Sequence, residues 1–275
     1  METVDCIICN SNTNVKVNTF DLPKDNLFTL VKCKCDFIFL NPRPDINSIK
    51  KYYDSQYLSD KERNSFYYRL LQNISFRWKY RLIKSIFSDY NGTLLDIGGG
   101  DSSFSNFISR KHWKAYSYDI NNNKFTLSDV LRLKDNSIDL ITLWHSIEHF
   151  HNINEIFTII QNKLKPNGYL MVACPNINAA EISILKNNWV AYDIPRHLYH
   201  FTPDTLNSYM KKYNFSIISK KIMFQDIIFN IFLSLRDYNL VLRLFYFIFI
   251  FFYSLANIFF NNDKSSSYTY ICKKK

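Results

Sequence analysis

Glycine is scarce in this sequence, since only five of its 275 residues are glycine. Three of the five are consecutive, at Gly98, Gly99 and Gly100. Glycine lets a backbone turn sharply and lets a ligand approach it closely. The run follows the apolar segment 93–97 and precedes the predicted helix 102–110, which is the arrangement of a nucleotide-binding loop. The rarity of glycine elsewhere favours a ligand-binding turn over a structural one.

Other signals are missing as well. The chain has no internal repeat and no low-complexity linker, and its 47% hydrophobic residues predict a folded core rather than disorder. The net charge is +10, but the lysines are scattered and no basic stripe is interleaved with aromatic residues. We therefore expect no specific nucleic-acid partner. The length fits one α/β domain with a small appendage.

Cysteine is concentrated near the start, where four of the six cysteines lie within 35 residues. Residues 1–10 are mixed and polar, so we expect no signal peptide and a cytoplasmic location, where disulfides are disfavoured. The four thiols are therefore interpreted as metal ligands. They are Cys6, Cys9, Cys33 and Cys35. Two prolines within 41–44 end this segment, residues 1–44.

The pattern changes twice along the rest of the chain. Residues 45–90 have apolar residues near helical spacing and form a predicted helical lead-in. In residues 91–275, short apolar segments alternate with helical ones, which predicts a doubly wound, Rossmann-like α/β fold with helices on both faces of a mostly parallel sheet. The predicted strands are 93–97, 113–118, 137–143, 169–173, 215–224 and 267–273.

Two acidic residues accompany the glycine loop. Asp119 ends the second predicted strand, where a carboxylate can accept hydrogen bonds from both ribose hydroxyls of a cofactor. Asp96 stands two residues before the first glycine, where it can meet the charged amino group of a methionine moiety. This position, and the late start of the first strand, favour S-adenosylmethionine (SAM) over a dinucleotide. An NAD-dependent dehydrogenase is a weaker alternative.

The same segments carry a family resemblance. Residues 94–100 and 118–119 resemble the first two motifs of class I SAM-dependent methyltransferases. The stretches 129–130, 135–144, 147–150, 164–170 and 175–176 resemble the later motifs of that family. The resemblance implies a seven-stranded sheet whose last strand is antiparallel. It also implies a SAM site made by Asp96, Gly98, Gly99, Gly100, Asp119, Ile120, Asp129, Val130, Trp144 and His145. Ser102 departs from the family, which usually has a glycine there.

A finer resemblance involves the N-terminal cysteines, residues 41–44 and residues 193–202. Together they are similar to a bacterial subgroup with a zinc-ribbon-like segment, which implies Zn²⁺ at the four cysteines and methylation of small molecules or sugars in surface polysaccharide pathways. A tetrahedral zinc site needs four thiolates. The Cys33-Lys34-Cys35 spacing is one residue shorter than usual, and a vestigial ribbon without metal is the alternative.

Histidine clusters late in the chain, since five of the six histidines fall between residues 145 and 200. His145 and His149 follow the fourth strand, at the sheet edge where ligands bind. O-methylation requires removal of a proton from the acceptor, and imidazole suits that task. We expect His149 or His197 to be the base. In the resembling proteins the loop that carries Asp193 and Arg196 covers the site, and the guanidinium can pair with a phosphate or carboxylate.

Two aromatic residues precede this loop. Trp189 and Tyr192 are candidates for stacking on a ring or sugar face of the acceptor. The alternative is that Trp189 fills the core.

Residues 240–260 are nearly all apolar and long enough to span a bilayer. They belong to an insertion, about residues 226–262, between the last two predicted strands. A single crossing would place those strands on opposite sides of the membrane. We therefore expect the insertion to pack on the domain or to lie in one leaflet, at the inner face of the cytoplasmic membrane, with Arg236, Arg243 and Lys264 near anionic lipid. A buried helix or a homodimer interface is the alternative.

Together these features predict a SAM-dependent methyltransferase that O-methylates a small molecule or a sugar or glycan precursor. Two alternatives stay open. One is methylation of RNA or protein, which the net charge suggests. The other is a non-catalytic binding module that keeps the fold.

Overall fold

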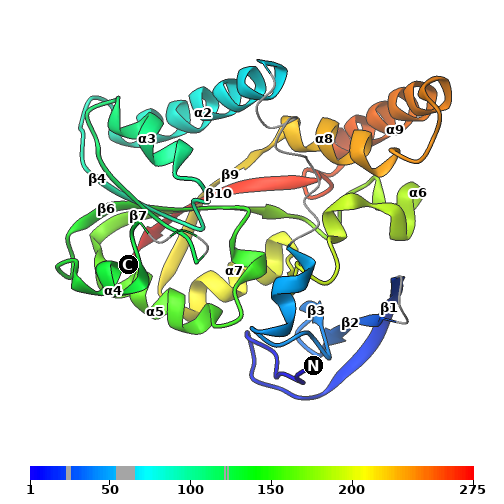
Figure 1. Cartoon of the computed structure of the whole chain (residues 1–275), viewed down its shortest axis with the longest axis horizontal. Helices are drawn as coiled ribbons and strands as arrows, with labels where there is room; N and C mark the ends of the chain where they lie inside the picture. The colour runs from blue at the N-terminus through cyan, green and yellow to red at the C-terminus, as the bar shows by residue number, and fades with distance from the viewer. Residues whose placement is uncertain (23–25, 54–65, 121, 123) are drawn as a thin grey trace.

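The computed structural model describes residues 1–22, 26–53, 66–120, 122 and 124–275 (Figure 1). Its main sheet has six strands in the described residues. In spatial order they are β5 (Lys114–Tyr118), β4 (Thr93–Ile97), β6 (Ile138–Trp144), β7 (Leu164–Pro175), β10 (Ser267–Lys274) and β9 (Phe215–Ile222). The predicted strands therefore all form, within a few residues of their expected bounds.

The strand directions explain where a ligand can bind. Strands β5, β4, β6 and β7 pair in parallel, and β10 is antiparallel to both β7 and β9. The chain leaves β4 toward β5 on one side and later returns to β6 on the other side. The carboxyl ends of β4 and β6 therefore border a topological switch point, where open α/β sheets bind their ligands.

The two faces of the sheet bury different side chains because strand residues alternate between them. Leu95 and Ile141 belong to one core cluster, and Leu94 and Leu140 belong to another. Every residue of β6 is buried, as expected for a central strand that is covered on both faces.

The helices form two layers around the sheet. Helices α2 (Phe66–Phe87) and α3 (Ser103–Ser109) cover one face, and α5 (Ile153–Lys163) and α7 (Pro203–Lys212) cover the other (Figure 1). Helix α7 begins where Thr202-Pro203 indicates, with the Thr202 hydroxyl accepting a hydrogen bond from the backbone N–H of Thr205. The remaining short elements are η1 (Ser48–Tyr52), η2 (Ile147–His149), α4 (Leu127–Arg132), α6 (Ile182–Leu185), η3 (Lys186–Asn188) and η4 (Val190–Tyr192).

The seventh strand implied by the family resemblance is not present among the described residues. Between β5 and β6 the chain instead forms α4. Thr126 and Asp129 make a capping box at its start, in which each side chain accepts a hydrogen bond from the backbone of the other. Such a cap commits the chain to a helix rather than to an added strand beside β5.

The N-terminal segment forms a second sheet with part of the main domain. Strands β1 (Asn14–Leu22), β2 (Asn26–Cys33) and β3 (Ile38–Leu40) are antiparallel, and β3 also pairs with β8 (Tyr199–His200). Buried Arg43 binds Glu2 and the hydroxyl of Tyr199. The predicted segment 1–44 is therefore attached to the main domain through β8 and Tyr199.

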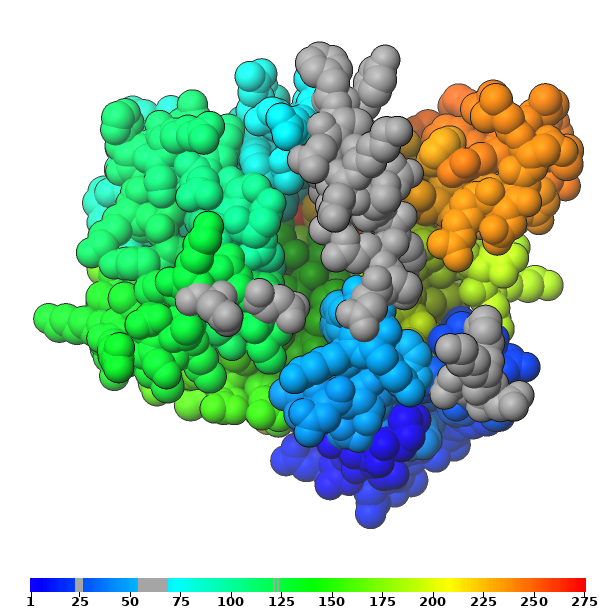
Figure 2. Space-filling view, in the orientation of Figure 1, coloured from blue at the N-terminus to red at the C-terminus, as the bar shows by residue number. Residues whose placement is uncertain are grey.

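The predicted insertion forms a helical hairpin between β9 and β10. It consists of α8 (Phe224–Ser234) and α9 (Leu240–Phe260). Within the described residues α9 is the one helix long and apolar enough, by length and composition, to cross a membrane, and 17% of its most apolar window is buried. In Figure 2 the hairpin (orange) stands at a corner of the molecule.

Candidate cofactor and acceptor site

The glycine loop between β4 and α3 has little room for side chains. Gly98 has a φ of +77°, and a Cβ there would collide with Ser146. A Cβ at Gly99 would collide with the Ser117 hydroxyl and press on Asp96. Gly100 also has positive φ, at +55°, but its Cβ would meet open space. The first two glycines are thus required by packing, and the third leaves the backbone open to a ligand.

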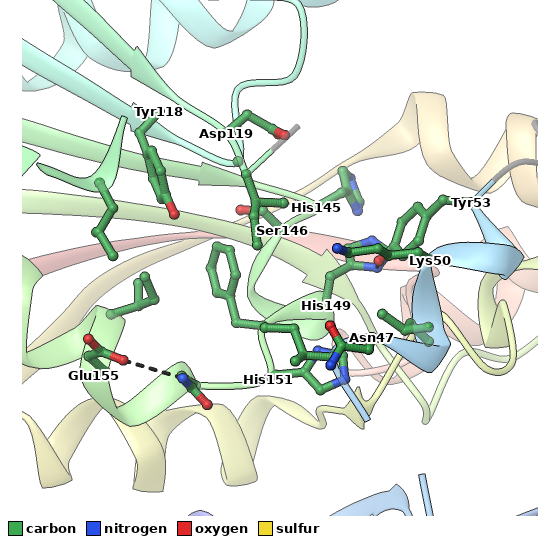
Figure 3. A pocket seen from close by; sticks show the side chains of 18 residues that line it. Asn47, Lys50, Tyr53, Tyr118, Asp119, His145, Ser146, His149, His151 and Glu155 are labelled. Atoms are coloured by element: carbon green, nitrogen blue, oxygen red, sulfur yellow. Dashed lines mark hydrogen bonds between the residues drawn. The ribbon is translucent and has the colours of Figure 1, made fainter. Parts of the chain in front are cut away.

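Asp119 lies beside this loop at the end of β5. Its Oδ2 accepts a hydrogen bond from the backbone N–H of Gly100 at 2.9 Å. Both Asp119 and Gly98 line a cavity of about 790 Å³. The cavity continues to His149 and to η1, as the close-up in Figure 3 shows. Of the cofactor residues predicted from the loop and the end of the second strand, Gly98 and Asp119 therefore line this cavity.

Asp96 is placed differently from the prediction. It does not line the cavity but lies beneath Gly99, 2% exposed, where its Oδ1 accepts a hydrogen bond from the Thr142 hydroxyl at 2.6 Å. Burial raises the pKa of Asp96 to about 6, although Thr142 and Lys79 oppose the shift. Asp96 therefore packs beneath the glycine loop and does not face the cavity.

Lys79 of α2 was not anticipated from the sequence. Its ammonium lies 4.4 Å from the ring centre of Trp144 and 5.2 Å from that of Phe104. Burial lowers the pKa of Lys79 to about 8, against the attraction of Asp96 and Asp226. Lys79 therefore places a cation close enough to Asp96 and Asp226 to interact with both carboxylates.

Three more predicted cofactor residues lie away from the cavity. Asp129 is occupied in the cap of α4, Val130 is buried in the core, and Trp144 packs edge-on against Phe104. Ile120, 70% exposed, does line the cavity, together with Leu127. The apolar wall beyond Asp119 is therefore made by these two residues rather than by Asp129 and Val130.

His145 lies between two carboxylates. Its Nε2 is 2.9 Å from Asp226 Oδ2, and its Nδ1 is 3.6 Å from Glu148 Oε1. Burial works against the charged imidazole, but Asp226 and Glu148 outweigh it and raise the pKa of His145 to about 10. His145 is therefore protonated at neutral pH and unsuited to accept a proton from an acceptor, which leaves His149 and His197 as the candidate bases.

His149, four residues later, has the opposite state. Burial first, and then electrostatic repulsion from the neighbouring His197 ring, lower the pKa of His149 to about 4. Its Nδ1 lies 3.0 Å from the Arg196 carbonyl and 3.3 Å from the Tyr53 hydroxyl. If Nδ1 donates to that carbonyl, Nε2 keeps its lone pair. His149 lines the main cavity as a neutral imidazole (Figure 3).

Glu148 lies at the centre of the histidines and is 1% exposed. Burial would raise its pKa, but the histidines, His145 first, hold it below its usual range. Its Oε1 is 4.0 Å from His197 Nε2, and neither carboxylate oxygen accepts a hydrogen bond within the described part of the chain. Nitrogen or oxygen atoms of Glu148, His149 and His197 lie within 4.8 Å of one another. A buried carboxylate therefore lies within 4.8 Å of one ring nitrogen of His149 and one of His197.

The predicted substrate loop reaches the same cluster. His197 Nδ1 contacts the Ala191 carbonyl at 2.9 Å, and His197 Nε2 is 3.6 Å from Asp193 Oδ2. Arg196, expected to bind an anion, donates two hydrogen bonds to Asp193 Oδ1 at 2.9 and 2.7 Å. Trp189, 1% exposed, is a core residue and not a stacking platform.

A second cavity of about 220 Å³ lies behind this cluster. Its polar wall is made by His145, Asp193 and His197. Its apolar wall includes Phe229 and Leu233 of α8. His145 lines both cavities, so the two spaces border the same imidazolium.

The four N-terminal cysteines converge as predicted. Cys6 Sγ is 3.5 Å from Cys35 Sγ, and Cys9 Sγ is 3.4 Å from Cys33 Sγ. All four sulfur atoms lie within 4.8 Å of one another. Thiolates bound to one tetrahedral zinc at ~2.3 Å stand about 3.8 Å apart, so the donor set fits such an ion.

Comparison with known proteins supports the Rossmann-like α/β fold described above. A family model described as a methyltransferase domain matches residues 62–220. The fold is similar to the 1,6-didemethyltoxoflavin-N1-methyltransferase of Burkholderia thailandensis, solved with S-adenosylhomocysteine (SAH), at 10% identity and a TM-score of 0.53 over 94% of this chain and 100% of that one. It is also similar to the phosphoethanolamine N-methyltransferase 2 of Haemonchus contortus, solved with SAM, at 16% identity and a TM-score of 0.53 over 94% and 71% of the two chains. No curated protein matches the sequence.

Proposed function

Since the chain belongs to the methyltransferase-domain family and is a SAM-dependent methyltransferase, we propose an acceptor for it. We propose that it methylates a hydroxyl oxygen of a small molecule, or of a sugar or glycan precursor. The observation that supports an oxygen acceptor most directly is the neutral imidazole of His149 at the main cavity, backed by the buried carboxylate of Glu148.

The residues around the glycine loop fit SAM. Gly98, Gly99 and Gly100 leave the loop without side chains, so that a ligand can approach its backbone. Asp119 would accept hydrogen bonds from the ribose hydroxyls, and Ile120 and Leu127 offer apolar surface for the adenine. When bound, SAM supplies a methyl group on a positively charged sulfur.

His149 would take the hydroxyl proton of the acceptor. Its depressed pKa keeps it neutral at physiological pH, so it needs no prior deprotonation. The positive charge that it acquires would be stabilised by Glu148, whose oxygens are buried and ionised. His197 is the alternative base, although its ring lies deeper, 8% exposed, beside the second cavity.

The N-terminal segment would hold a structural Zn²⁺ at Cys6, Cys9, Cys33 and Cys35. The sulfur separations support this proposal. Metal analysis should give one zinc per chain, and Cys9→Ser should lose it. A fully folded protein without metal, after expression with zinc, would contradict the proposal.

The location that we propose is the inner face of the cytoplasmic membrane, with contact through residues 240–260. The exposed apolar surface of α9 supports it. Flotation with anionic vesicles tests it, since a protein that stays wholly in the soluble fraction would exclude such contact.

Methyl transfer itself is tested with SAM labelled in the methyl group and a panel of sugars, glycosides and phenols. Label should move to an acid-stable and base-stable ether, and His149→Gln should abolish most of the transfer. Label found instead in RNA or protein of a cell extract would replace this proposal with the macromolecular alternative.

A further inference from the structure

The α8–α9 hairpin exposes an unusual amount of apolar surface. Of the 21 residues of α9, only Arg243 is charged. On this helix Val241, Phe245 and Phe252 are 77, 65 and 63% exposed, and both terminal phenylalanines are 85% exposed. Monomeric proteins in water rarely leave so large a continuous apolar patch uncovered. Something other than water therefore covers this face.

A narrow stripe of buried residues on α9 holds the hairpin to the domain. Ile250, Ser254 and Ile258, spaced four residues apart, are the buried residues of α9. The Ser254 hydroxyl donates to buried Glu181, and Arg243 donates to the carbonyl of Phe232 on α8. These contacts fix the outward face, so its exposure does not come from a loosely attached helix.

The topology decides how the hairpin can meet a membrane. Strands β9 and β10, on either side of it, are antiparallel neighbours in one sheet. Helix α8 has 11 residues and spans only about 16 Å, far less than the roughly 30 Å of a hydrocarbon core. A crossing by α9 would therefore separate strands that are paired. The hairpin can only lie along one leaflet.

The surroundings favour anionic lipid over a second protein copy. Helix α2 lies beside α8, where the Gln225 amide donates to the Ser75 hydroxyl, and α2, α8 and α9 share one edge of the molecule (Figure 1). The sequence of α2 contains several cations but no acidic residue. Its first turns also expose Leu70 and Leu71. A basic helix with apolar residues, beside an apolar hairpin, complements a leaflet with negative headgroups.

The inner side of α8 builds the active site. Asp226 of α8 pairs with His145, and Phe229 and Leu233 form the apolar wall of the 220 Å³ cavity. The opposite wall holds His197 and Asp193. One short helix therefore faces the proposed lipid with its outer side and the proton-handling residues with its inner side. Phe229, 51% exposed, belongs to both.

We propose that the acceptor is an amphiphile, with a polar head that carries the hydroxyl group and an apolar chain, and that it enters the cavity beside His145 from an anionic leaflet along α8. The head would pass along the polar wall and His145, which lines both cavities, so that its hydroxyl group reaches His149 in the main cavity. Phe229 and Leu233 would contact the start of the chain. This inference rests on the proposed function for the methyl transfer, but the entry route is a property of the hairpin and can be tested without turnover.

The first test uses dodecyl maltoside, a sugar on an alkyl chain, below its critical micelle concentration. Calorimetry of the intact protein should show one site that binds it about tenfold or more tightly than maltose, because the site would bury part of the alkyl chain. Phe229→Gln should weaken that site about tenfold, whereas Phe224→Gln, on the same helix but outside the cavity, should leave it within about twofold. Equal effects of the two changes would overturn the entry route.

The second test measures binding of the protein to lipid vesicles. The intact chain should float with mixed phosphatidylcholine and phosphatidylglycerol vesicles and less with phosphatidylcholine alone. Replacing Phe245, Phe249 and Phe252 together by Glu should abolish flotation, and Val15→Glu, a change at an equally exposed apolar residue in β1, should not. A lipid-free dimer that never floats would overturn the lipid assignment in favour of a second copy.

The proposed function and the proposed entry route can be refuted independently of each other. SAH binding and label transfer to soluble acceptors report the methyltransferase function. Dodecyl maltoside binding and flotation report the hairpin. Normal SAH binding without either hairpin signal would sink the inference and leave the proposed function intact.

Discussion

The proposed cofactor side and the proposed acceptor side of the site are built in different ways. The cofactor side comes from one stretch of chain, from β4 to α4, and depends on backbone shape at Gly98, Gly99 and Gly100. The acceptor side joins side chains from distant segments, such as Tyr53 after η1 and Asp226 of α8. We therefore expect the cofactor side to be sensitive to added side-chain volume. We expect the acceptor side to be sensitive to changes of charge and protonation.

The largest effect is expected on the acceptor side, from His149→Gln. Loss of a general base costs about 10²–10⁴-fold in kcat, and SAH binding should hardly change. His151→Gln, a cavity histidine whose Nε2 contacts the Pro44 carbonyl, is the matched control. An equal loss in the control would show that the cavity needs histidine for structure rather than for proton transfer.

The pH dependence sharpens the contrast between the two histidines. Because the pKa of His149 is lowered to about 4, this base stays neutral as the pH falls from 7.5 to 5.5, and kcat should not show the acid loss of an ordinary histidine. A pH–rate profile of the intact protein, with acceptor and SAM saturating, measures this. A limb near 6.5 would contradict the assignment of His149.

On the cofactor side, Gly98→Ala should be the most damaging single change. The added methyl meets Ser146 at a φ of +77°, so we expect a loss of about 1–3 kcal/mol in stability together with weaker SAH binding. Gly100→Ala is the control, because its Cβ has open space and only the backbone strain, ~1 kcal/mol, remains. Thermal unfolding with and without SAH separates the two. Equal losses would mean that packing against Ser146 is irrelevant.

A smaller effect is expected from Asp226→Asn. The pKa of His145 rises from 6.5 to about 10 on folding, so its contribution to stability is complete below pH 6.5 and is lost as the pH rises toward 10. About a third of the His145 side chain is exposed, and solvent screening therefore limits the contribution of this ion pair to stability to roughly 1–2 kcal/mol. The free energy of unfolding should fall across this window in the native chain and fall less in the variant. Parallel curves would show that Asp226 does not hold the proton on His145.

The same contrast explains what could be predicted from the sequence. The strands, the glycine loop and Asp119 were predictable because local periodicity and loop chemistry determine them. Asp129 was misplaced because its side chain competes for the backbone at the start of α4, a local choice that motif resemblance does not reveal.

The acceptor side was only partly predictable. The histidines were expected at the carboxyl edge, but the charge of His145 depends on Asp226, a residue of an insertion that appears apolar in sequence. Glu148 was within a recognised motif, yet its burial among three histidines is a tertiary property. Charge states that arise from such contacts cannot be derived from residue spacing.

The most direct measurement is calorimetric titration of the purified protein with SAM and SAH, beside Asp119→Ala and the exposed control Asp237→Ala. We expect both ligands to bind, Asp119→Ala to weaken binding by about 1–3 kcal/mol through the unpaired ribose hydroxyls, and the control to bind normally. Folded protein that binds neither ligand would contradict the central claim that this cavity is a SAM site.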